Sequence, residues 1–191
     1  CSKLSNVEIP DSVTTIGEKA FYQCTNLSEV YWGKQLKTIG KSAFSGSGIR
    51  SAILPEGVDS IAHGAFYSCD SLRIVSIPST VRRIVKKETQ INGPFYSCSA
   101  LDSIYWNAYK CSDIPFNYSS DKNIRVVEFG DSIKRIPNSF CYQFGNLTTV
   151  LFPKKLKSIG SSAFYRCSKL SNVEIPDSVT TIGEKAFYQC T

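Results

Sequence analysis

Residues 1–25 read CSKLSNVEIPDSVTTIGEKAFYQCT, and residues 167–191 repeat these letters without a change. Between the two copies the same pattern recurs in weaker form, and its leading aliphatic residue marks the period. Successive leading residues are 22 or 23 positions apart, except for one step of 29. They are Leu4, Leu27, Ile49, Leu72, Leu101, Ile124, Leu147 and Leu170. Eight repeats of about 23 residues therefore fill a single domain that covers residues 1–191, with no linker.

The repeat can be written C-x-x-L-x-x-V-x-I-P-x-x-V-x-x-I-G-x-x-A-F-x-x. The segment L-x-x-V-x-I has the Val, Ile and aromatic content of a strand, and the Pro after it has no N–H to donate to a ladder. A second short extended piece, V-x-x-I, is followed by Gly, which permits a turn. Because one such coil cannot bury its apolar face alone, the pattern predicts stacked coils that share one continuous core.

Length and composition favour a folded domain with a sizeable core: 191 residues, 42% hydrophobic and 20% charged. No stretch approaches the 18 consecutive apolar residues of a membrane span. The sequence begins with Cys1, contains no Met and shows no signal peptide, so we expect a fragment of a longer array. A single histidine, His63, argues against His-rich metal sites and triad chemistry, and the carboxylates are scattered. We expect neither enzymatic activity nor a cofactor.

The motifs C-x-x-L-x-x-V-x-I-P and I-G-x-x-A-F-x-x-C resemble those of the BspA-like, or Treponema pallidum-type, leucine-rich repeats. They are best preserved in repeats 1, 2, 7 and 8, and the resemblance covers nearly all of the chain. It implies a β-rich solenoid: a right-handed leucine-rich-repeat superhelix of about eight coils with a parallel sheet on its concave side. It also implies a cell-surface or secreted protein, with adhesion to host extracellular-matrix or surface proteins, and hence virulence, as the expected role.

Several coils depart from this pattern, and we expect irregular coils within residues 69–122. Repeat 4 carries about six extra residues in the stretch 85–93, which predicts a loop on the turn side, and repeat 5 loses the motif after Trp106. Repeat 3 has Ser47-Gly48 in place of the usual Cys and is one residue shorter. In repeat 6 the stretch 140–144 reads FCYQF instead of AFYQC, so Phe and Cys exchange positions and the core volume is nearly conserved.

Eight cysteines raise the question of disulfides or a metal site. Cys141 takes the position of the repeat's Phe, and Cys111 takes that of its second Val if Ile114 matches the following Ile. The other six occupy the first, inward position of a repeat: Cys1, Cys24, Cys69, Cys98, Cys167 and Cys190. We therefore favour reduced, buried thiols, with some disulfides as the alternative. The absence of C-x-x-C argues against zinc.

The net charge of +6 raises the question of nucleic acid or an acidic membrane surface as a partner. Most of the 22 Lys and Arg residues lie in the half-repeat after the first strand, where a charged row is usually a solvated face. That half lacks the interleaved aromatic residues of single-strand binders, so we expect no nucleic-acid partner. Weak attraction to anionic glycans or lipid stays open.

Alternation in L-x-x-V-x-I points two residues of each coil outward. None of the sixteen outward positions is Lys or Arg, and repeats 2 to 7 each present a large apolar or tyrosyl side chain there. This strand face is a candidate protein-binding surface, although strands favour such residues for cross-strand packing alone. Its candidate contact residues are Glu29, Tyr31, Ile53, Ile74, Tyr105, Val126, Glu128 and Leu151. The adjoining position of four repeats is charged: Arg50, Arg73, Asp102 and Arg125.

Three functions compete at this point. The first is protein–protein interaction or adhesion at the cell surface, the second a structural repeat array without a specific ligand, and the third an intracellular scaffold.

The N-x-[ST] sequons at Asn26, Asn117 and Asn146 are few enough to arise by chance and matter only in a eukaryotic source. Since the pattern runs to both ends without a polar cap, we expect the terminal coils to permit head-to-tail self-association.

Overall fold

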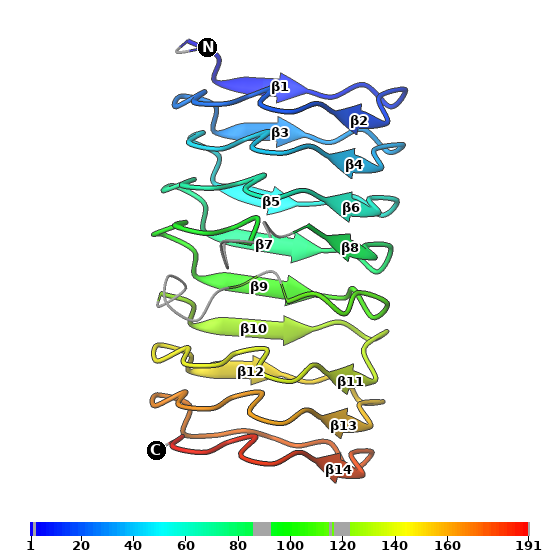
Figure 1. Ribbon diagram of the computed structural model, residues 1–191, viewed down its shortest axis with the longest axis vertical. Coiled ribbons are helices and arrows are strands. Elements are labelled where there is room, and N and C mark those ends of the chain that lie inside the picture. Colours follow the sequence, from blue (N-terminus) through cyan, green and yellow to red (C-terminus); the bar gives the residue numbers. More distant parts are fainter. Residues whose placement is uncertain (2, 86–92, 115, 117–122, 191) are drawn as a thin grey trace.

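A computed structural model describes residues 1, 3–85, 93–114, 116 and 123–190. These residues form a β-solenoid of about seven turns with no helix, so the predicted parallel-strand repeat fold is confirmed. Figure 1 shows the longer strands stacked in one column and the shorter strands in a second, with the two termini at opposite ends of the stack. The expected bulging loop of repeat 4 falls on residues 86–92 and lies outside the described residues.

The first column contains the strands built from L-x-x-V-x-I. They are β1 (Asn6–Glu8), β3 (Glu29–Tyr31), β5 (Ser51–Ile53), β7 (Ile74–Ile77), β9 (Ser103–Trp106), β10 (Val126–Phe129) and β12 (Thr149–Leu151). Every pair is parallel, and the ladder runs β1-β3 and then β5-β7-β9-β10-β12. The interruption between β3 and β5 coincides with the residue missing after Ser47, where Gly48 packs against the backbone of the preceding coil.

The second column contains two-residue strands from the second half of each repeat. They are β2 (Thr15–Ile16), β4 (Thr38–Ile39), β6 (Ser60–Ile61), β8 (Arg83–Ile84), β11 (Arg135–Ile136), β13 (Ser158–Ile159) and β14 (Thr181–Ile182). This ladder stops between β8 and β11 in repeat 5, as expected from its lost motif. There the carboxylate of Asp113 accepts a 3.5 Å hydrogen bond from the N–H of Ile84 in place of a ladder partner.

The eighth predicted strand is absent, which corrects the sequence expectation for the last coil. Residues 172–174 form no strand, although Val173 still packs on the core. An open cleft of about 610 Å³ lies between β12 and this coil, lined by Leu151 and Phe152 on one side and Ile175 on the other. The short strand β14 of the same coil still pairs with β13, so only the first half of this coil leaves the ladder.

A spine of aromatic rings forms the centre of the core. Successive rings stack with centroids 5.0 to 5.9 Å apart, in the order Phe21, Phe44, Phe66, Phe95 and Phe116. In repeat 6 the predicted exchange is confirmed, because Phe140, Cys141 and Phe144 are all buried. The ring of Phe140 meets Trp106 edge-on at 5.2 Å and so keeps the core filled where the stacked spine ends.

Most of the cysteines line this spine as thiols that form no disulfide. From Cys69 onward, each cysteine at the first position of a repeat donates to the carbonyl O of the preceding coil's Phe position, as in Cys69 to Phe44 and Cys98 to Phe66, both at 3.0 Å. The same contact recurs from Cys167 and Cys190 at 3.1 Å. The predicted buried thiols are confirmed for six residues, namely Cys24, Cys69, Cys98, Cys111, Cys141 and Cys167. The prediction is wrong for Cys1, which is exposed at the end of the stack, and Cys190 is only partly buried.

Cys111 takes the predicted position in irregular repeat 5. Its N–H donates to the carbonyl O of Ala108 at 3.1 Å, the same turn contact that Val13 makes to Pro10 at 3.0 Å in repeat 1. Ile114 packs against the core nearby. The alignment of Cys111 with the second Val of the repeat is therefore confirmed.

The glycine that follows four of the seven short strands has a different role from the one expected. Gly17, Gly40, Gly160 and Gly183 do not adopt a left-handed conformation. A Cβ on Gly40 would meet the carbonyl O of Ile16 at 2.7 Å, whereas one on Gly17 would meet nothing within 4 Å. At Gly40 glycine therefore allows the backbones of successive coils to approach closely and is not needed for a turn.

Candidate protein-binding face

The long strands place two rows of outward side chains on one face, which we call the strand face. The ladder register aligns the first row as Asn6 and Glu29, then Ser51, Ile74, Ser103, Val126 and Thr149. It aligns the second row as Glu8 and Tyr31, then Ile53, Ser76, Tyr105, Glu128 and Leu151. All eight predicted contact residues therefore lie on this face.

Four of the predicted residues are large, apolar or tyrosyl, and strongly exposed. The exposed fractions are 58% for Tyr31, 58% for Ile53, 46% for Ile74 and 50% for Leu151. The inward residues next to Ile53 and Ile74 are fully buried, since Ala52 and Val75 are both 0% exposed. Ser51 pairs with Ile74 and Ile53 with Ser76, so Ile53 and Ile74 are diagonal neighbours that form one apolar patch.

Tyr31 is held in place by its own strand. Its hydroxyl donates to the Glu29 carboxylate at 2.9 Å, and this hydrogen bond raises the pKa of Tyr31. The two side chains lie two residues apart on the same strand and share the outward face. The predicted Glu29 and Tyr31 thus form a single pre-arranged polar and aromatic feature at one end of the apolar patch.

Tyr105 and Val126 differ from the other predicted residues because both are half-buried. The Tyr105 hydroxyl lies 2.6 Å from the place where a Cβ on Gly130 would stand, so its ring packs over this glycine. Burial, followed by the carboxylates of Glu128, Asp131 and Glu56, raises the pKa of Tyr105. Its hydroxyl is therefore directed into the protein's own surface rather than toward a partner.

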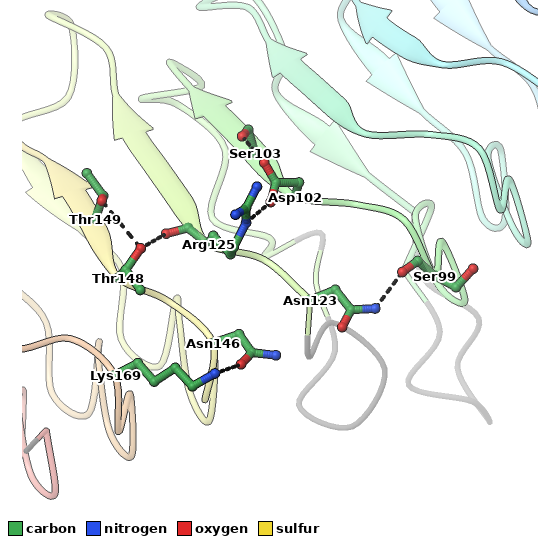
Figure 2. Close-up of polar contacts among 9 residues, drawn as sticks. All are labelled: Ser99, Asp102, Ser103, Asn123, Arg125, Asn146, Thr148, Thr149 and Lys169. Atoms are coloured by element: carbon green, nitrogen blue, oxygen red, sulfur yellow. Dashed lines mark hydrogen bonds and ion pairs between the residues drawn. The ribbon is translucent and has the colours of Figure 1, made fainter.

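An open cleft lies where the central long strands begin. Figure 2 shows six of its polar residues, namely Ser99, Asp102, Ser103, Asn123, Arg125 and Asn146. Its volume is about 530 Å³, and the residues lining it include Arg73, Ile74, Ser99, Ser103, Asn123 and Arg125. Arg125 forms an ion pair with Asp102, and Ser103 donates to the same carboxylate at 2.9 Å. The pKa of Asp102 is lowered, chiefly by the hydrogen bond from Arg125, so this carboxylate stays ionised.

The sequence reading missed three polar residues of this cleft: Ser99, Asn123 and Asn146. Asn123 donates from Nδ2 to the carbonyl O of Ser99, and Asn146 accepts from Lys169 Nζ at 2.6 Å (Figure 2). A signal existed, because both asparagines directly precede the leading aliphatic residue of a repeat. That position joins the turn to the strand. The asparagines were missed because outward-facing residues were predicted only within the strand segment L-x-x-V-x-I.

On the opposite half of the repeat, four of the cations form ion pairs with carboxylates of the preceding coil. Lys34 lies 3.4 Å from Asp11 and Lys41 lies 3.2 Å from Glu18. Asp59 is 3.6 Å from both Arg82 and Arg83. The predicted solvated basic row is thus partly neutralised by carboxylates one coil away, and such exposed pairs add little stability.

A row of tyrosines follows the buried Phe spine on the turn side, which the sequence reading also missed. Tyr142, Tyr165 and Tyr188 stack with ring centroids 4.8 and 5.1 Å apart, and Tyr67 stacks on Tyr96 at 5.8 Å. The guanidinium of Arg166 lies over the Tyr165 ring at 5.3 Å. The tyrosine row could have been predicted from the sequence, because the residue after the repeat's Phe position is Tyr in most coils.

Within the described ranges, no three His, Cys, Asp or Glu side chains are grouped closely enough to hold a metal ion. No helix among the same residues is long and apolar enough to cross a membrane.

A family model described as the BspA type leucine rich repeat region (6 copies) matches residues 1–90 and again residues 86–191. The chain belongs to the BspA-type leucine-rich repeat family. The resemblance read from its motifs is therefore confirmed. No curated protein matches it.

Three solved leucine-rich repeat proteins share the fold, each at 23% identity. The T. pallidum leucine-rich repeat protein has a TM-score of 0.64, and the alignment covers 89% of this chain and 79% of that one. The proteins from Bacteroides ovatus and Eubacterium ventriosum have TM-scores of 0.62 and 0.63 over 100% and 97% of this chain. This chain spans 48% and 58% of the length of those two proteins.

Proposed function

We propose that this chain is a cell-surface or secreted module that binds a protein partner, as in adhesion, through the strand face. The observation that carries the proposal is the exposed patch of Tyr31, Ile53 and Ile74, with Leu151 further along the same face. Exposed apolar and tyrosyl groups on a rigid sheet match the composition of protein interfaces. Such a module works by binding, without catalysis or a cofactor.

Family membership supports the choice of a protein as the ligand, because solenoids offer extended surfaces for protein contacts. Charge supports it as well. The outward rows of the described long strands carry Glu8, Glu29 and Glu128 but no Lys or Arg, so nucleic acid would be repelled there. A partner that is an extracellular-matrix or host surface protein is the form of this proposal that the family resemblance favours.

The test is binding to immobilised extracellular-matrix proteins by the purified chain and two double variants. Tyr31→Ala with Ile53→Ser removes two of the three large side chains of the patch and should weaken binding about 30-fold, because the anchor residues of an interface contribute about 2 kcal/mol. Lys154→Ala with Lys157→Ala is the matched control on the basic half and should change binding less than about twofold. Thermal unfolding checks that both variants fold.

Two results would contradict the proposal. Equal weakening by both variants, or weakening by the lysine variant alone, would place the working surface on the basic half of the repeat. Failure of the chain to bind any protein of the panel would favour the alternative, a structural array without a specific ligand. Location is tested separately: an antibody against the chain should label intact cells of the source organism without permeabilisation.

A further inference from the structure

Two arginines stand on adjacent coils at the border of the strand face. Arg50 precedes β5 and Arg73 precedes β7, and the backbone N–H of Arg73 donates to the carbonyl O of Arg50 at 2.9 Å. Paired parallel strands lie about 4.8 Å apart, so the two side chains leave the backbone side by side. Both residues are exposed. The fold thus gathers two positive charges at one point of the strand face.

Neither guanidinium has a partner within ion-pair or hydrogen-bond distance among the described residues, although the charge of Arg73 helps to lower the pKa of Asp102 on the next coil. Other arginines of the chain do, since Arg82 and Arg83 pair with Asp59, and Arg125 pairs with Asp102. Arg50 and Arg73 form no ion pair and donate no side-chain hydrogen bond within the described part of the chain. Like charges on neighbouring strands repel, so this arrangement becomes favourable when an anion is bound between them.

The surroundings of the pair are partly apolar. Ile53 lies on the strand that Arg50 precedes, and Ile74 directly follows Arg73. Both isoleucines are about half exposed, at 58% and 46%. The 530 Å³ cleft extends from Arg73 and Ile74 toward the next long strand. A ligand that fills this site must offer anionic groups and apolar groups at close spacing.

We propose that Arg50 and Arg73, with Ile53 and Ile74 beside them, bind a carboxylate-rich segment of the protein partner. This inference rests on the proposed function and names the chemistry of the partner. Guanidinium groups bind carboxylates through paired, charge-assisted hydrogen bonds, and two adjacent guanidinium groups hold two carboxylates of one extended peptide. Apolar side chains of the same peptide then cover the two isoleucines.

Charge on the rest of the face limits the length of the acidic segment. Asp102 continues the row of Arg50 and Arg73, and it already neutralises Arg125. Glu29 stands on β3, in the coil before Arg50, and Glu128 stands on β10, which follows β9 in the ladder. A long polyanion such as a sulfated glycan would meet these carboxylates, whereas a short acidic segment over the arginine pair avoids them.

The probe for the test is a fluorescein-labelled peptide of alternating glutamate and leucine, with binding followed by fluorescence anisotropy. Arg50→Ala with Arg73→Ala should weaken binding about tenfold or more, because the carboxylates lose their partners. Lys154→Ala with Lys157→Ala removes the same net charge and should weaken it about twofold or less. Asp102→Ala frees Arg125 and should strengthen binding, a gain that general loss of structure cannot produce. A peptide of alternating lysine and leucine should not bind.

Three outcomes would overturn the inference. They are equal weakening by both double variants, no binding of the acidic peptide, and a sulfated polysaccharide that binds with the same dependence on Arg50 and Arg73. These failures are separable from failure of the proposed function. If matrix-protein binding depends on Tyr31 and Ile53 but not on the two arginines, the strand face binds a protein whose contact segment is not acidic.

Discussion

At the scale of single residues, the glycine column sets how closely the coils approach. Gly40→Ala would place a methyl group 2.7 Å from the carbonyl O of Ile16, and backbone cannot move aside cheaply. We expect this change to lower the free energy of unfolding by about 1–3 kcal/mol. Gly17→Ala is the matched control, with nothing within 4 Å, and should be neutral or stabilising by up to about 1 kcal/mol. Urea unfolding of the two variants measures the difference; equal effects would show that close coil packing is not the reason for glycine.

Thiol reactivity should follow position in the stack. Burial raises the pKa of Cys167 to about 12 and that of Cys141 well above its ordinary value. Because only the thiolate reacts, a raised pKa means slow reaction at pH 8. A chromogenic disulfide reagent should label Cys1 at once, Cys190 slowly and the buried thiols only in denaturant. Rapid labelling of most of the eight thiols in native protein would contradict the inward assignment.

The outward residues of the strands show which features of the strand face can be predicted from the sequence and which cannot. Alternation about the buried Ala52 and Val75 was enough to predict that Ile53 and Ile74 face outward. It could not show that Tyr105 leans over Gly130, because that contact joins residues of two different coils. The spacing of 22 residues between Leu27 and Ile49 predicts a coil that is one residue shorter than most. It could not predict that the ladder is interrupted between β3 and β5, because that depends on how the backbones of the two coils stack.

At the scale of elements, repeat 6 shows that a coil can exchange its core residues as a set. Phe140 packs on Trp106 and Phe129, at 5.2 and 5.1 Å between ring centroids, while Cys141 is fully buried beside it. Cys141→Phe alone should overpack the coil and lower the free energy of unfolding by about 1–3 kcal/mol. The triple change Phe140→Ala, Cys141→Phe and Phe144→Cys restores the usual pattern and should cost less than the sum of its parts.

Thermal and urea unfolding of the three single variants and the triple variant complete this comparison. If the change in the free energy of unfolding of the triple variant equals the sum of the three single changes, the three side chains do not share one packing volume. The residue pattern FCYQF in place of AFYQC was sufficient to predict the exchange, because the repeat defines which positions face inward. The edge-on ring contacts that accommodate it could not be predicted from the pattern.

At the scale of the whole molecule, the two ends of the stack expose residues that interior coils bury. Ile182 is 51% exposed, whereas the equivalent Ile159 is 1% exposed. We therefore still predict head-to-tail association, in which the first coil of one copy contacts the last coil of another. Sedimentation should show a mass that rises with concentration, and Ile182→Lys should suppress the rise. Ile74→Lys, on the strand face, is the control and should not. A strict monomer at high concentration would contradict the prediction.

The most direct test of the strand face as the working surface is hydroxyl-radical footprinting of the chain with and without a bound matrix protein. Binding should protect Tyr31, Ile53, Ile74 and Leu151, which are the exposed large side chains of that face. The turn-side Tyr22 and Tyr67 are about as exposed, at 42% and 40%, and should react equally in both samples. Protection of the turn-side tyrosines with the strand face unchanged would contradict the account.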